Sequence, residues 1–149
     1  MSNRKRPTLR DIAPDAYRAI SGIETYISQC GLEKSLVELV KMRASQINAC
    51  AFCLDMHSRH ARADGETEHR LYLLEAWREA PLYTDRERAA LAWTEHLTRL
   101  SSAPAPPADR DRLADSFSPL EIANLTVLIG LINLWNRIAV GGGFHLEAA

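Results

Sequence analysis

Two cysteines and a histidine stand close together near the middle of the chain, at Cys50, Cys53 and His57. If Cys50 opens a helix, the three side chains fall within one sector of about 60°, because each helical residue turns by about 100°. Asn48 is a suitable N-cap and would place both cysteines in the first turn, where unsatisfied N–H groups favour thiolate over thiol. His57, one turn beyond Cys53, could act as a base or stabilise the thiolate. The spacing therefore predicts a dithiol redox site.

Two other interpretations of this cluster stay open on the residues alone. The cysteines could be small buried hydrophobic side chains beside a hydrogen-bonded core histidine. Alternatively, Cys50, Cys53 and His57, with His60, could bind zinc. Seven helical residues separate Cys50 from His57 by about 10 Å along the axis, which disfavours a shared ion. The chain also has no second C-x-x-C that would complete a structural zinc site.

The elements that position these residues are expected to be helices. Apolar residues recur at helical spacing between glycines and prolines, and two capping boxes, Thr84–Glu87 and Ser118–Glu121, mark helix starts. The final segment is apolar nearly all round, which indicates burial on several sides. The fold class is therefore all-α, a compact bundle of about seven helices. The expected helices lie at about Pro14–Gly31, Lys34–Ile47, Ala49–Ala63, Leu71–Trp77, Thr84–Leu100, Asp109–Ala114 and Ser118–Ile138.

Length and charge restrict the class of protein. The 149 residues fit one domain, expected at 14–149 after a flexible N-terminal arm at 1–13. A net charge of −1 argues against a nucleic-acid surface, and we expect no apolar run to approach the ~20 residues of a membrane span. The basic N-terminus has no apolar signal core, and three cysteines are too few for a secreted disulfide framework. These features favour a cytoplasmic protein, and the apolar last helix favours a homo-oligomer.

Glu38 extends the motif to E-x11-C-x2-C-x3-H, ending at His57. With this spacing the chain resembles the alkylhydroperoxidase D-like branch of the carboxymuconolactone decarboxylase family. The flanking sequence agrees over about Pro14 to Arg137. The supporting stretches are L-V-K-M-R-A-S-Q-I-N before the cysteines, W-R-E-A and E-R-A-A-L in the middle, and N-L-W-N-R near the end.

The resemblance implies a helical protein that oligomerises, as a dimer, trimer or hexamer, and a peroxidase cycle without metal or organic cofactor. By this resemblance Cys53 attacks a hydroperoxide substrate and Cys50 then closes a disulfide with it. Glu38 and His57 would relay the proton, and a lipoyl-bearing or thioredoxin-like dithiol protein would reduce the disulfide. Helix-dipole reasoning by itself instead favours Cys50 as the more activated thiol, because it lies nearer the helix start.

Two consequences follow for the site. On one continuous helix Glu38 would lie about 22 Å from Cys53, so a relay requires a sharp chain reversal, expected at Asn48-Ala49. The resemblance also implies a second histidine between the cysteines, and Phe52 stands there instead, which shortens the relay.

Four residues outside the motif also have expected roles, and two alternative functions stay open. His60 is expected at the surface or in a supporting position, Asn136 and Arg137 in structural roles, and Cys30 as an unreactive thiol. Two alternatives to a peroxidase remain: decarboxylation of a lactone acid, which needs no cysteine pair, and a redox sensor without turnover on the same fold.

Overall fold

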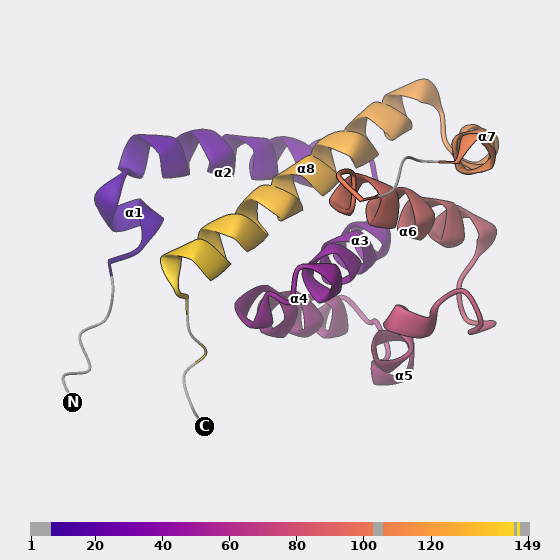
Figure 1. The fold of residues 1–149 in the computed structure, drawn as a ribbon, viewed down its shortest axis with the longest axis horizontal. Helices are drawn as coiled ribbons and strands as arrows, with labels where there is room; N and C mark the ends of the chain where they lie inside the picture. Colours follow the sequence, from indigo (N-terminus) through magenta and orange to yellow (C-terminus); the bar gives the residue numbers. More distant parts are fainter. Residues whose placement is uncertain (1–6, 103–105, 145, 147–149) are drawn as a thin grey trace.

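The structure is a computed structural model that describes residues 7–102, 106–144 and 146. Within these ranges the chain forms eight α-helices and one short 3-10 helix and contains no strand, which confirms the predicted all-α class. Figure 1 shows the helices in chain order. They are α1 (Leu9–Ile12), α2 (Pro14–Gln29), α3 (Lys34–Ile47), α4 (Ala51–Ala63), α5 (Glu68–Tyr72), the 3-10 helix η1 (Leu74–Ala76), α6 (Asp85–Thr98), α7 (Pro107–Ser116) and α8 (Pro119–Gly142).

The last helix, α8, is the centre of the fold. It runs diagonally across the molecule and contacts α2, α3, α4, α6 and α7 (Figure 1). Its buried face joins residues from α2, α3, α6 and α7 in the largest apolar cluster. The α8 members of that cluster are Leu125, Leu128, Ile129 and Leu131. One face of this apolar helix is thus buried among its neighbours, whereas Leu120, Val127 and Leu134 stay exposed.

By length and composition alone, α8 is also apolar enough to cross a membrane, so the expectation that no segment approaches such a length was wrong. Its buried polar residues show how this fold uses it. Asn124 accepts a hydrogen bond from Tyr26 of α2, Asn136 donates to Ser45 of α3, and Asn133 donates to Thr98 of α6. These bonds tie α8 to three other helices, as in a core helix.

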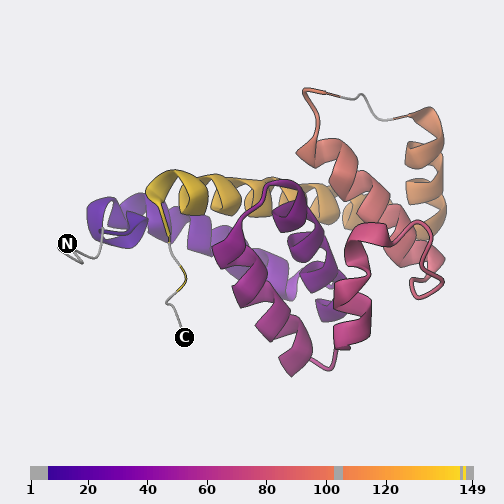
Figure 2. The same ribbon diagram turned by 60° about the horizontal axis from the view of Figure 1, so that its bottom comes forward.

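Helices α3 and α4 form the hairpin that carries the candidate site. They lie side by side at the front of the molecule in Figure 2, on the side of α8 facing the viewer. The apolar face of α3 is divided between two clusters, with Leu36 and Val40 packed near α8 and Leu39 and Met42 packed near α5 and η1. The hairpin is therefore held on both sides.

Both predicted capping boxes are present, at the starts of α6 and α8. In the second, the Glu121 carboxylate accepts the backbone N–H of Ser118 and an ion pair from Arg86. The Ser118 backbone N–H, together with Arg86 and the Ser118 hydroxyl, lowers the pKa of Glu121 from 4.5 to about 2. The cap is therefore an ionised one at neutral pH.

Several expected boundaries differ from the structure, and α8 ends at Gly142 where Ile138 was expected. The helix expected across Leu71–Trp77 is broken into α5 and η1, although Leu71 and Leu74 are both buried. Helix α7 extends beyond the expected 109–114, because Pro107 occupies its first position. A one-turn helix, α1, lies within the expected N-terminal arm, whose residues 1–6 fall outside the described ranges.

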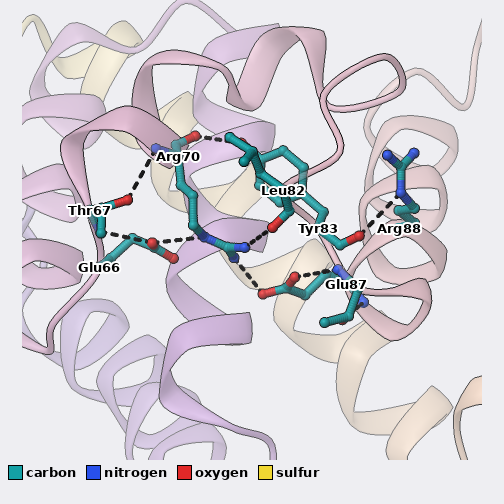
Figure 3. Close-up of polar contacts among 8 residues, drawn as sticks. Glu66, Thr67, Arg70, Leu82, Tyr83, Glu87 and Arg88 are labelled. Atoms are coloured by element: carbon teal, nitrogen blue, oxygen red, sulfur yellow. Dashed lines mark hydrogen bonds and ion pairs between the residues drawn. The ribbon is translucent and has the colours of Figure 1, made fainter.

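Arg70 joins α5 to the segment that enters α6 (Figure 3). Its guanidinium binds Glu66, Glu87 and the carbonyl oxygen of Leu82, while the Tyr83 hydroxyl donates to the Arg70 carbonyl. The guanidinium is a rigid, planar group with five N–H donors. One side chain therefore connects the turn at Glu66, the loop at Leu82 and the first turn of α6 at Glu87. This junction supports the apolar cluster against which α3 packs.

Candidate active site

Cys50 and Cys53 are joined by a disulfide at the start of α4, with their Cα atoms 5.3 Å apart. Cys50 is itself the N-cap, and its Sγ accepts the backbone N–H of Cys53 at 3.3 Å. The expectation that Asn48 caps this helix was therefore wrong by two residues. Both cysteines are almost fully buried, at 1% and 2% exposure. The pair thus sits where the positive end of the helix dipole acts on it.

A tight reversal separates α3 from α4. Asn48 ends α3, and Ala49 adopts a left-handed backbone conformation with φ of 52°. The N–H of Cys50 then returns to the carbonyl oxygen of Ser45 at 3.0 Å. Left-handed backbone is unfavourable for a residue with a Cβ atom, so the surrounding contacts must hold it. The reversal lies at the predicted position.

Those contacts come from α8. The Asn48 side-chain amide donates to Asn133 at 3.0 Å and to Asn136 at 2.9 Å, and Asn136 donates in turn to Ser45 at 3.0 Å. Ser45 and Asn136 are buried, and no buried side-chain nitrogen or oxygen in the described ranges lacks a partner. Asn48 is displaced from the capping role by these bonds. Arg137 bonds the carbonyl of Asn133 and so supports the same network.

The reversal brings Glu38 of α3 against His57 of α4. His57 Nδ1 lies 2.9 Å from Glu38 Oε2, and the two side chains are 5% and 12% exposed. A carboxylate in this position holds the imidazole in the tautomer with the proton on Nδ1, which leaves Nε2 free to accept a proton. His57 is one helical turn beyond Cys53. The structure therefore places the four residues of the motif on two adjoining helix segments.

Two aromatic residues cover the cysteines. Phe52 contacts Phe144 edge to face, with ring centroids 5.3 Å apart, and both pack against Cys50, Cys53 and Ala139. Phe144 reaches this position because Gly143, with φ of 65°, ends α8 in a left-handed turn and the Phe144 N–H bonds Ala139. Phe52 therefore contributes apolar cover at the position where the resemblance implies a second histidine.

His60 and Cys30 take the places expected of them. His60 is exposed on the same face of α4 as His57, with the two ring centroids 5.9 Å apart. Cys30 ends α2 as a partly buried free thiol outside this cluster.

A cavity of about 210 Å³ opens beside Glu38, between α2 and α3. Ile27, Leu32 and Val37 give it an apolar wall, and Lys41, paired with Glu24 at 2.9 Å, gives it a charged one. The lining includes Glu38 but neither Cys50 nor Cys53. Glu38 is therefore reached by solvent through a cavity that the two sulfurs do not line.

Comparison with known proteins agrees with this geometry. Residues 14–96 match the model of the carboxymuconolactone decarboxylase family, which covers more than half of the chain. The chain belongs to the carboxymuconolactone decarboxylase family. The uncharacterised protein YdfG of Bacillus subtilis (strain 168) is a relative with 38% identity over 139 residues, covering 93% of this chain and 95% of its own length.

Solved structures place this family member among the AhpD-like ones. A protein of unknown function from Agrobacterium tumefaciens, named as a candidate AhpD antioxidant defence protein, is 41% identical with a TM-score of 0.93, and the match covers 98% of this chain and all of that one. The debrominase Bmp8 shares the fold at 22% identity, with a TM-score of 0.77 and 91% and 73% of the two chains covered. The fold therefore accommodates more than one activity.

Sequence reasoning missed three residues of this site. Ser45 and Asn133 hold the reversal, and Phe144 covers the cysteines. Asn133 and Asn136 stand three residues apart in an otherwise apolar helix, and this pattern was a usable signal, because buried amides require partners. No comparable signal marks Phe144, whose position depends on the turn at Gly143.

Proposed function

We propose that this protein is a thiol-dependent peroxidase that reduces hydrogen peroxide or small organic hydroperoxides. The observation that carries the proposal is the Glu38–His57 pair, 2.9 Å apart and buried one turn from a dithiol at a helix start. The AhpD-like fold and the C-x-x-C pair are consistent with this class of activity. A buried carboxylate–imidazole pair next to a thiol is an arrangement that can generate a thiolate and handle its proton.

The proposed cycle assigns one role to each cysteine. With His57 accepting the thiol proton, the Cys53 sulfur attacks the peroxide, the O–O bond breaks, and Cys53 becomes a sulfenic acid while the leaving oxygen takes up the proton. The Cys50 sulfur then attacks the Cys53 sulfur, an S–S bond forms, the S–O bond breaks and water leaves. A dithiol reductant supplies the two electrons and two protons that restore both thiols.

The reductant we propose is a lipoyl-bearing or thioredoxin-like protein in the reducing cytoplasm, acting on a homo-oligomer. Reduction requires a nucleophilic thiolate to reach one of the two sulfurs, which lie under Phe52 and Phe144. Movement of this aromatic cover is therefore part of the proposal.

The test is hydroperoxide consumption with a dithiol reductant by the wild type, Cys53→Ser and Cys50→Ser. We expect turnover only in the wild type. Cys50→Ser should still form one sulfenic acid per chain at Cys53, trapped by a dimedone-type reagent and located by mass spectrometry. Cys30→Ser is the matched control and should keep full activity, because Cys30 lies outside the cluster.

Two results would contradict the proposal. Activity retained in Cys53→Ser would show that Cys50, and not Cys53, attacks the peroxide. This is the assignment that the helix dipole alone favours. The second result has two parts: no turnover with any dithiol, and a decarboxylation activity that survives thiol alkylation. Together they would show that the protein is a lyase of the wider family and not a peroxidase.

A further inference from the structure

We propose that Glu38, His57 and His60 form a binding site for a single divalent metal ion of the zinc class. Each residue offers one ligand atom, and these three atoms all lie within 4.8 Å of one another. The cluster joins two elements, with Glu38 on α3 and both histidines on α4. It differs from a zinc site on the cysteines, which are engaged in the disulfide.

The helix geometry prepares this ligand set. His57 and His60 are three residues apart, so they share one face of α4. Tetrahedral zinc, with bonds of about 2.0–2.1 Å to histidine nitrogen, needs ligand atoms roughly 3.3 Å apart. Two of the three are already held at 2.9 Å by the Glu38–His57 contact. The third ligand atom lies within 4.8 Å of the other two, and rotation of the exposed His60 side chain is the movement that would complete the set.

The three proposed ligands differ in burial, from the buried His57 to the exposed His60. His57 is 4% exposed and Glu38 is partly buried, so the positions of these two ligands are restricted by packing. His60 is exposed and provides the side from which an ion enters. With three protein ligands, the fourth position stays open to water, as is typical of zinc sites that exchange ligands.

The donor types select the metal. Two imidazoles and one carboxylate suit zinc and its neighbours cobalt and nickel, whereas calcium and magnesium prefer an all-oxygen set of six or more ligands. Competition by excess magnesium should therefore be weak.

Occupation of this site would block the proton relay, because the metal takes the Glu38 oxygen and the His57 Nδ1 whose hydrogen bond holds the imidazole in the tautomer that the relay requires. This consequence rests on the proposed peroxidase function, whereas metal binding itself does not. The site would make the enzyme reversibly sensitive to free zinc.

The test uses the full-length, untagged and oxidised protein, in which the disulfide removes both thiolates as ligands. Zinc is titrated against a chromophoric indicator and by calorimetry. We expect one ion per chain, and at least about tenfold weaker binding for His60→Ala, because a ligand is lost. His69→Ala, a change of another exposed histidine on α5, is the matched control and should bind as the wild type does.

Cobalt gives a second measurement that does not depend on a variant. A bound Co²⁺ ion should give the visible absorption of a four- or five-coordinate site in the wild type and lose it in His60→Ala. No zinc binding by the oxidised wild type, or equal binding by His60→Ala, would overturn the site.

The inhibitory consequence is measured separately, as a single turnover of peroxide by pre-reduced protein with and without zinc. Zinc should slow the wild type more than His60→Ala, and chelation should restore the rate. Equal inhibition of both would assign the effect to the thiols and overturn the blocked relay. Zinc binding in a protein without any peroxide turnover would overturn the proposed function and leave the site standing.

Discussion

At the scale of single residues, the site depends on how Glu38 holds His57. The two side chains come from different helices and meet at 2.9 Å in a largely buried setting. In such surroundings a carboxylate can only accept the Nδ1–H of the imidazole and so fixes its orientation, and the negative charge acts with little screening by solvent. The charge of Glu38, and not merely its shape, should therefore matter.

Glu38→Gln is expected to lower the rate constant for reaction with peroxide by about 100-fold or more, the usual size of a general acid–base contribution. The change keeps the side-chain volume but removes the negative charge. Stopped-flow measurement of sulfenic acid formation in a Cys50→Ser background would report this step directly. Glu79→Gln, at an exposed position, is the control and should leave the rate unchanged. An unaltered rate in Glu38→Gln would remove the glutamate from the relay.

Ala49 is the second residue on which the site depends, since its φ of 52° is the turn between α3 and α4. A non-glycine residue in this conformation costs about 1–2 kcal/mol. Ala49→Gly should therefore leave the free energy of unfolding unchanged or raise it by up to about 1 kcal/mol, because relief of strain outweighs the added chain entropy.

Ala49→Val should lower the free energy of unfolding by about 1–3 kcal/mol, because a β-branched side chain tolerates this conformation less well. Denaturant unfolding measures both variants, and Ala51→Val in the first turn of α4 is the matched control for branching. Destabilisation by glycine greater than that by valine would contradict a left-handed Ala49.

The residue types and their spacing were enough to select the four residues that the structure brings together, but not to predict the turn that joins their helices. Glu38, Cys50, Cys53 and His57 stand in the sequence, and their separation requires a reversal near Asn48. The sequence does not predict that Ala49 adopts the left-handed conformation, because alanine does not favour it. The misplaced N-cap follows from the same cause.

At the scale of elements, helix boundaries with strong local signals were predicted well. Helix α3 spans Lys34–Ile47 as expected, and both capping boxes are formed. The break between α5 and η1 was missed, because Leu71, Leu74 and Trp77 keep helical spacing across it and tertiary packing decides the outcome. Local signals thus determine ends more reliably than they determine continuity.

The cap of α8 gives an expected pH dependence. Because hydrogen bonds and Arg86 lower the pKa of folded Glu121 from 4.5 to about 2, its stabilising contribution is complete above about pH 4.5 and is lost as the pH falls through about 2. The urea midpoint of the wild type should therefore decrease across this window. Glu121→Gln should start lower and decrease less steeply, with Glu79→Gln as the control. Parallel slopes in all three proteins would exclude Glu121 as a source of the acid sensitivity.

At the scale of the whole molecule, an apolar stripe stays exposed on the central helix. Leu120, Val127 and Leu134 recur every seven residues along α8 and are 65%, 43% and 39% exposed. Ile23 and Tyr26 of α2, a helix that contacts α8, are exposed as well. A stripe of this kind on the core helix is what the proposed homo-oligomer would bury.

The proposed assembly predicts a concentration-dependent mass above that of one chain in sedimentation or light scattering. The double variant Val127→Glu/Leu134→Glu should weaken association at least tenfold, because two apolar contacts are lost and two charges are introduced. Leu100→Glu, at an exposed leucine after α6, is the control and should associate as the wild type does. A monomeric wild type at every concentration would contradict the assembly.

The asparagine network between α8 and the reversal has a consequence for synthesis of the chain. Asn136 leaves the ribosome about 80 residues after Cys53, several seconds later at about 5–20 residues per second. Until then nothing from α8 holds Asn48 and Ser45 in place. A nascent chain that lacks α8 therefore carries both thiols without the frame that aligns them, and reactivity toward peroxide should arise only after α8 has been synthesised.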